Sequence, residues 1–140
     1  LHRRNRFRLA VIVATVAEPT AGKRARGWHL DGRVAAVVGT HTHVQTADAR
    51  LLPGGTAYIT DAGMTGPHDS IIGMERADIL ARFVTGLPAK MEPAEANPRL
   101  QGVVVEADDR TGLALSIIRI DWTPQDIRDA RRAEDDEQPV

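Results

Sequence analysis

Two short apolar runs near the start of the chain, at residues 9–17 and 34–38, are rich in β-branched side chains and have the length of strands. The polar segment 20–30 between them is compatible with a helix that ends before Gly32. A strand, a helix and a second strand within roughly 30 residues predict a βαβ unit with parallel strands and a right-handed crossover. The second run stays apolar up to Gly39, which is typical of a strand covered on both faces. We therefore expect an α/β fold.

The first apolar run also has a second interpretation. Four arginines in segment 3–8 precede it and small residues end it, which is the outline of a secretory signal. Its nine residues are too few to cross a bilayer, which needs about 20. Because a helix and another strand follow in βαβ order, the strand interpretation is favoured. We accordingly expect a cytoplasmic protein with no membrane partner.

The middle of the chain predicts another strand, a long loop and a second helix. Strand 56–60 follows a Pro–Gly–Gly turn, and the glycine-rich loop 61–73 comes after it. The helix spans 74–87, ending before a proline. Its apolar residues fall at helical spacing and are expected in the core: Ile79, Leu80, Phe83 and Val84.

The C-terminal third predicts a hairpin and a tail. The β-rich runs 102–107 and 113–120 are joined by a polar turn, which indicates two antiparallel strands. After Trp122 the chain becomes strongly charged, so residues 123–140 are expected to form a disordered tail.

Composition excludes several functions. Cysteine is absent from the 140 residues, so disulfides, thiolate metal sites, iron–sulfur clusters and cysteine nucleophiles are excluded. The 18 Lys and Arg nearly balance the 19 Asp and Glu, and a net charge of −1 argues against a dedicated nucleic-acid-binding protein. The first 33 residues hold eight of the basic side chains and two of the acidic ones. Solvated charge at the chain ends explains this asymmetry, with nucleic-acid binding through segment 3–8 as the weaker alternative.

The sequence GTHTH at 39–43 is the strongest local signal for chemistry, because open α/β sheets bind ligands at the ends of their strands. His41 and His43 are two residues apart, so in an extended segment both imidazoles point to the same side and can bind a metal ion. Asp48 and Asp61 are candidates for the carboxylates that orient the rings. The alternative is a pair of histidines held by neighbouring hydroxyl groups. Zinc takes three or four protein ligands, so two histidines do not complete a site.

Other chemical signals are weaker. His2, His29 and His68 are expected to be surface or packing residues. The sequence has no phosphate-binding Walker loop, nucleophile elbow, dinucleotide fingerprint or HExxH motif. The loop at 61–67 is compatible with a substrate pocket, an oligomer contact or a structural turn.

Several longer stretches resemble one family. They are GWHLDGR at 27–33, VVGTHTHVQTAD at 37–48, TAYITDAGMTGP at 56–67 and DSIIGM at 69–74. These stretches are similar to the YmdB-type metallophosphoesterases, which are calcineurin-like 2′,3′-cyclic-nucleotide 2′-phosphodiesterases. The resemblance extends over about residues 17–122.

The resemblance implies a four-layer α/β/β/α sandwich, of which this chain is the C-terminal half. It implies two divalent metal ions, of iron, manganese or zinc, whose bridging hydroxide attacks the phosphorus of a small cyclic-nucleotide substrate. His41 and His43 match the last metal-binding motif of the family, one histidine for each metal. The resemblance leaves the catalytic and substrate-binding residues of this chain unassigned, and we expect a homo-oligomer.

The chain also departs from the family pattern. The family's earlier motifs, an Asp, a Glu–Asn pair and an Asn–His pair, have no counterpart here. Where the family has DFHAE, this chain has ATVAE at 14–18, so Val16 replaces a metal-binding histidine. We expect a basic leader at 1–8 outside the family and a partial, inactive metallophosphoesterase domain at 9–122. The alternative function is a non-catalytic α/β module that binds a partner or forms oligomers.

Overall fold

The computed structural model describes residues 9–136, with side chains described up to residue 133. This part of the chain is a mixed α/β structure with two sheets and three helices. It divides into two compact units: the first contains the segments up to Gly63 and Gly102–Arg119, and the second contains Met64–Gln101 and the segment from Ile120 onward. The predicted leader at 1–8 lies outside the described residues. No helix within 9–136 is long and apolar enough to cross a membrane.

The first unit begins with the predicted βαβ arrangement. Strand β1 (Ile12–Thr15) is followed by helix α1 (Thr20–Leu30) and strand β2 (Ala36–Gly39). The two strands are parallel, with Ile12 opposite Ala36 and Thr15 opposite Gly39. Strand β1 is shorter than the apolar run 9–17 because pairing with β2 ends at Thr15. The interpretation of this run as a strand is confirmed.

Two further strands complete this sheet, in the order β1-β2-β4-β3. Strand β4 (Ala57–Ile59), within the predicted segment 56–60, pairs in parallel with β2. The short strand β3 (Arg50–Leu51) pairs antiparallel with β4. The three parallel strands therefore present their carboxyl ends at the same edge of the sheet, followed by segments that begin at Val16, Thr40 and Thr60.

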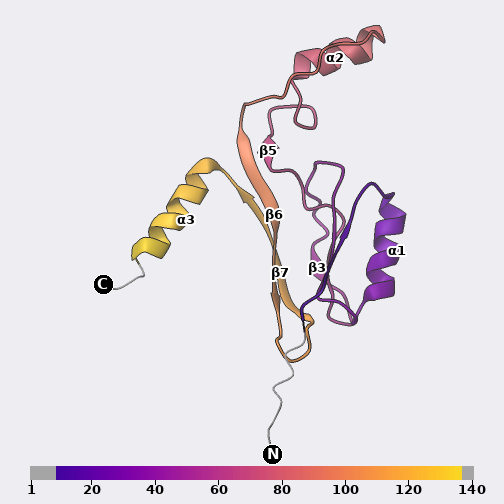
Figure 1. The fold of residues 1–140 in the computed structure, drawn as a ribbon, viewed down its shortest axis with the longest axis vertical. Coiled ribbons are helices and arrows are strands. Elements are labelled where there is room, and N and C mark those ends of the chain that lie inside the picture. Colours follow the sequence, from indigo (N-terminus) through magenta and orange to yellow (C-terminus); the bar gives the residue numbers. More distant parts are fainter. Residues whose placement is uncertain (1–8, 137–140) are drawn as a thin grey trace, which may run out of the picture. The chain divides into compact units, whose positions relative to one another are not determined.

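Both faces of β2 and β4 are covered, as the continuous apolar run predicted. On one face, Val37 and Tyr58 pack in a cluster beneath α1, which lies alongside the sheet in Figure 1. Gly27 allows this approach, because a Cβ there would lie 2.6 Å from the Tyr58 ring. On the other face, Ala36 and Ala57 pack against Ala114. Small side chains on this second face allow close contact between the layers.

The second sheet has the order β5-β6-β7. Strands β6 (Pro98–Ala107) and β7 (Ala114–Trp122) form the predicted hairpin, which the turn at 108–113 closes, and both extend beyond their predicted bounds. Strand β5 (Gly66–Pro67), from within the predicted loop 61–73, pairs antiparallel with β6. The α/β fold class is thus confirmed.

Helix α2 (Arg76–Thr85) lies inside the predicted helix 74–87, but its apolar face is not in the core. Ile79 is buried, whereas Leu80 is 54% exposed and Phe83 and Val84 exceed 80%. The expectation that all four are core residues is wrong for these three. Helical spacing shows which residues share a face, but it does not show whether another element covers that face.

The charged segment after Trp122 is also more ordered than the predicted tail. Residues 124–136 form helix α3 (Pro124–Asp136). Asp126 Oδ2 accepts hydrogen bonds from the Thr123 N–H and hydroxyl, both at 2.7 Å, and the Asp126 N–H donates to Thr123 Oγ1 at 3.2 Å. This reciprocal pair is a capping box, and Pro124 occupies the first helical position, where proline is favoured. Residues 124–136 are thus helical where the charge pattern predicts a tail, because the capping box provides a local start for the helix.

Candidate metal site

The candidate site lies where β2 and β4 end. The Ala62 N–H donates to Gly39 O at 2.8 Å, and the Thr40 N–H donates to Thr15 O at 3.0 Å, so the chain remains paired past the strand ends. Gly39 is essential to this arrangement, because a Cβ there would lie 1.8 Å from Thr60 O. The segment that carries the two histidines starts directly after this contact.

His41 and His43 are both exposed, and the backbone around them is bent. Their φ angles are 117° and 63°, in a region that side chains other than glycine rarely adopt. The spacing of the two histidines predicts both imidazoles on one side of an extended segment. The structure does not support that geometric premise, because the local conformation breaks the alternation of an extended strand.

Asp61 is the buried anchor of this bend. The Thr42 N–H and the Thr42 hydroxyl both donate to Asp61 Oδ2 at 2.8 Å, and the Gly63 N–H donates to Oδ1 at 2.9 Å. The sequence suggested Asp61 as a carboxylate that orients an imidazole ring. In the structure its carboxylate holds Thr42, the residue between the two histidines.

Asp48 makes a second set of contacts near the same strand end. Its Oδ1 accepts from the Thr46 hydroxyl at 2.6 Å and the Thr60 N–H at 3.1 Å, and its Oδ2 accepts from the Thr60 hydroxyl at 2.5 Å. Partial burial alone would raise the pKa of Asp48, but these hydrogen bonds outweigh it and hold the pKa below its usual value. Asp48 therefore joins the segment after the histidines to the end of β4.

Lys23 is a site residue that the sequence analysis missed. Its side chain is 2% exposed, and its Nζ donates to Thr40 O at 2.5 Å and lies 3.7 Å from Asp61 Oδ2. A buried ammonium group is costly unless it is paired and hydrogen-bonded, and these two oxygens provide both. Nothing in the polar helix sequence distinguishes Lys23 from its basic neighbours, so only the packing of α1 on the sheet reveals it.

The remaining candidates do not join the site. His29 is exposed on α1, with its Nε2 3.5 Å from an Arg33 nitrogen, and His68 Nε2 lies 3.2 Å from Met64 O in the second unit. Val16, for which the resemblance implies a histidine in the family, is 60% exposed after β1. His2 lies outside the described residues.

The donor set at the strand ends fits a metal ion only in part. Imidazole is a suitable ligand for iron, manganese or zinc. Within residues 9–136, however, no group of three or more His, Asp or Glu side chains is arranged to hold an ion. The described residues therefore fit part of a metal site in chemistry but do not complete one in number.

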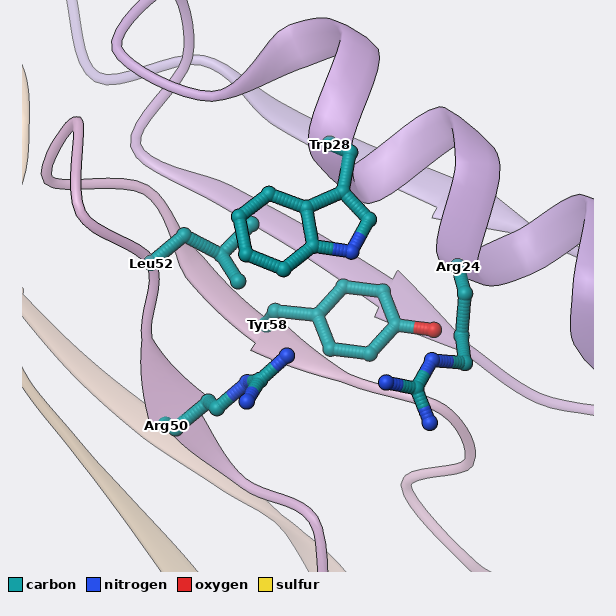
Figure 2. A pocket seen from close by; sticks show the side chains of 5 residues that line it. All are labelled: Arg24, Trp28, Arg50, Leu52 and Tyr58. Atoms are coloured by element: carbon teal, nitrogen blue, oxygen red, sulfur yellow. The ribbon is translucent and has the colours of Figure 1, made fainter.

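A separate pocket lies between α1 and the β3–β4 edge. Figure 2 shows the guanidinium groups of Arg24 and Arg50 near the rings of Trp28 and Tyr58, and Leu52 also lines the pocket. The Arg50 guanidinium carbon is 5.5 Å from the Trp28 ring centroid, a cation–π contact. The pocket is too narrow to admit a water molecule, so it is a packed surface contact rather than a ligand site.

Known proteins resemble this chain in sequence. The model of the YmdB-like protein family matches residues 2–120, a range that begins inside the segment 1–8. The 2′,3′-cyclic-nucleotide 2′-phosphodiesterase of Bacillus subtilis (strain 168) is 60% identical over 104 residues, which are 74% of this chain and 39% of that protein. The chain spans about two-fifths of the length of the curated relatives it matches.

Two solved structures are also similar. A hypothetical protein from Thermus thermophilus has a TM-score of 0.76 and 44% identity, over 81% of this chain and 44% of that one. A novel phosphatase from Mycoplasma pneumoniae has a TM-score of 0.71 and 38% identity, over 83% of this chain and 43% of that one. The fold is consistent with part of a metallophosphoesterase. The family match over residues 2–120 shows that the chain belongs to the YmdB-like protein family, whose relatives bear the names of phosphodiesterases and phosphatases.

Proposed function

We propose that this chain is part of a metal-dependent phosphodiesterase that hydrolyses small cyclic nucleotides, and that His41 and His43 are its metal ligands. The observation that carries the proposal is the placement of two exposed imidazoles at the carboxyl edge of a parallel sheet, on a segment anchored by Asp61. The name of the Bacillus subtilis relative supports cyclic nucleotides bearing a 2′,3′-phosphodiester as the substrate class.

The residues of this chain would bind and orient metal, but they would not complete a catalytic metal site by themselves. A divalent ion of iron, manganese or zinc would supply Lewis acidity toward a phosphoryl oxygen. His41 and His43 would contribute one donor to each of two such ions, and no third His, Asp or Glu side chain joins them within residues 9–136. By this ligand count the isolated chain binds metal weakly.

Metal binding to the two histidines tests the proposal. We expect Mn²⁺ to broaden the imidazole NMR signals of His41 and His43 before those of His29, because ligand sites of open α/β sheets lie at the carboxyl ends of the strands, where His41 and His43 are located and His29 is not. Titration calorimetry should show that His41→Ala or His43→Ala weakens Mn²⁺ binding about tenfold, the effect of losing about 1.4 kcal/mol.

The matched control is His29→Ala, which removes an exposed histidine from α1 and should leave the affinity unchanged. Equal Mn²⁺ binding by wild type, His41→Ala and His43→Ala would contradict the assignment of these histidines as ligands.

The second candidate function is a non-catalytic module that forms oligomers or binds a partner. The exposed apolar face of α2, where Phe83 is 81% and Val84 is 83% exposed, favours it, since such faces are often contact surfaces. Metal content and mass in solution separate the two functions. Bound metal in the purified chain supports the phosphodiesterase, whereas a stable metal-free oligomer supports the module.

A further inference from the structure

The two histidines share an unfavourable backbone. Both have positive φ angles, and residues other than glycine incur steric strain in this conformation. Such strain persists only where surrounding contacts hold the backbone in place. The contacts that hold the histidine segment can therefore be identified from its neighbours in the chain, Thr40, Thr42 and Val44.

Thr42 is held from inside the protein. Its N–H and hydroxyl both donate to the same oxygen of Asp61, which is fully buried. Because Thr42 lies between His41 and His43, these two bonds fix the backbone that follows His41 and precedes His43. Hydrogen bonds to a charged carboxylate are about twice as strong as neutral ones, so this is a firm anchor.

The Thr42 hydroxyl also closes the turn around His43. It accepts a hydrogen bond from the Val44 N–H at 3.3 Å while it donates to Asp61. A hydroxyl has one proton to donate and two lone pairs to accept, so both bonds form together. The residues on either side of His43 are thus tied to one side-chain oxygen.

Lys23 is hydrogen-bonded to Thr40, the residue that precedes His41. Its ammonium group donates to Thr40 O and faces Asp61 Oδ2 at 3.7 Å, with both side chains almost fully buried. The ammonium group therefore balances the carboxylate that anchors Thr42 and also fixes the carbonyl that precedes His41. The buried Lys23–Asp61 pair is therefore hydrogen-bonded to the backbone on both sides of His41, to the Thr40 carbonyl and to the Thr42 N–H.

We infer that Asp61, through Thr42, and Lys23, through Thr40, are positioning residues that preset His41 and His43 in the conformation required for binding metal. The metal-binding part of this inference rests on the proposed function. The structural part concerns the backbone conformation and is independent of metal. Preset ligands bind more tightly because the ordering of the segment is completed before binding.

Thr42→Val tests the inference, because it removes the hydroxyl but keeps the side-chain shape at an exposed position. The Val44 N–H then loses its acceptor and residue 42 loses one of its two bonds to Asp61. We expect amide hydrogen exchange at residues 42 and 44 to accelerate about tenfold, the effect of losing one charge-assisted bond, and the imidazole signals of both histidines to shift. Mn²⁺ affinity at the histidines should fall by a similar factor.

Two variants control this experiment. Thr42→Ser retains the hydroxyl and should restore exchange and Mn²⁺ affinity to within about twofold of wild type. Thr85→Val removes a hydroxyl that bonds Ala81 O on α2, in the other unit, and should change neither measurement at the histidines.

The outcomes separate this inference from the proposed function. Unchanged exchange and unchanged imidazole signals in Thr42→Val would overturn the positioning role, even if Mn²⁺ binds through His41 and His43. Accelerated exchange that Thr42→Ser reverses supports the positioning of the segment. If the wild-type chain then binds no Mn²⁺, the positioning stands and the proposed metal role fails.

Discussion

At residue 39, the lack of a side chain allows the ends of β2 and β4 to meet. The carbonyl oxygen of Thr60 occupies the space that a Cβ would need, and the segment with His41 begins one residue later. The sequence pattern predicts only that a strand ends at Gly39. The need for glycine arises from Thr60, which lies 21 positions later in the chain. The sequence alone does not show that these two residues are in contact.

We predict that Gly39→Ala destabilises the first unit by more than about 3 kcal/mol, because the clash is with backbone that cannot move aside cheaply. Urea denaturation followed by circular dichroism measures this change. Gly22→Ala on α1 is the control, since the nearest atom to its Cβ is a Glu18 side-chain oxygen at 3.5 Å. It should be neutral or stabilising by up to about 1 kcal/mol, as alanine favours helices over glycine. A Gly39→Ala protein as stable as Gly22→Ala would contradict the prediction.

Lys23 and Asp61 show the same dependence on tertiary contacts. The sequence identified Asp61 as a site residue from its position after a strand, but it assigned the carboxylate to a ring rather than to Thr42. Lys23 had no distinguishing signal, because lysine in a polar helix normally faces solvent. Their partnership requires α1 to pack on the sheet, and the sequence does not give the rotation of the helix about its axis.

At the scale of elements, Asp48 links the segment after the histidines to the end of β4 through Thr46 and Thr60. Its lowered pKa means that the folded state favours the ionised carboxylate. The resulting stability is fully present above the ordinary value of 3.8 and is lost as the pH falls through the lower folded pKa.

We predict that Asp48→Asn destabilises the protein by about 1 kcal/mol at pH 7, since one acceptor oxygen becomes a donor at this partly exposed site. The difference from wild type should shrink as the pH falls below about 4, where wild-type Asp48 also loses its charge. Urea denaturation at several pH values measures it. Asp109→Asn, in the exposed hairpin turn, is the control. If the difference in unfolding free energy between wild type and Asp48→Asn stayed constant as the pH fell to and below the folded pKa, ionised Asp48 would not be the cause of that difference.

The two helices outside the first unit illustrate different failures of prediction. For α2 the periodicity identified a helix, but the burial of its apolar face depended on a covering element. For α3 the local signal was present, as Thr123, Pro124 and Asp126 form a helix start. Charge density alone does not indicate this helix, because capping is the more local and more specific interaction.

At the scale of the whole molecule, membership of a family and possession of a complete metal site are separate properties. The match over residues 2–120 establishes the family, while the chain spans about two-fifths of the length of its curated relatives. Within residues 9–136, the histidine pair gains no third donor. Catalysis by a metal site requires a complete and oriented set of ligands, so family membership by itself does not make this chain active.

We predict that the isolated chain with added Mn²⁺ hydrolyses a generic aryl phosphodiester no faster than Mn²⁺ alone, because its donors do not complete a site. The release of the coloured phenolate measures turnover. His41→Ala is the comparison variant and should give the same background rate. Robust turnover by wild type that His41→Ala abolishes would show that the site is complete in this chain.

The sequence alone determined the α/β class, the βαβ unit, the hairpin and the family resemblance, because these depend on local periodicity, turn residues and contiguous motifs. It also located the histidine pair at a strand end. Only the tertiary structure decided that the histidine segment is bent, that Asp61 holds Thr42, that Lys23 is buried beside Asp61 and that Leu80, Phe83 and Val84 on α2 are exposed. These properties arise from contacts between residues far apart in the chain, whose geometry no local pattern specifies.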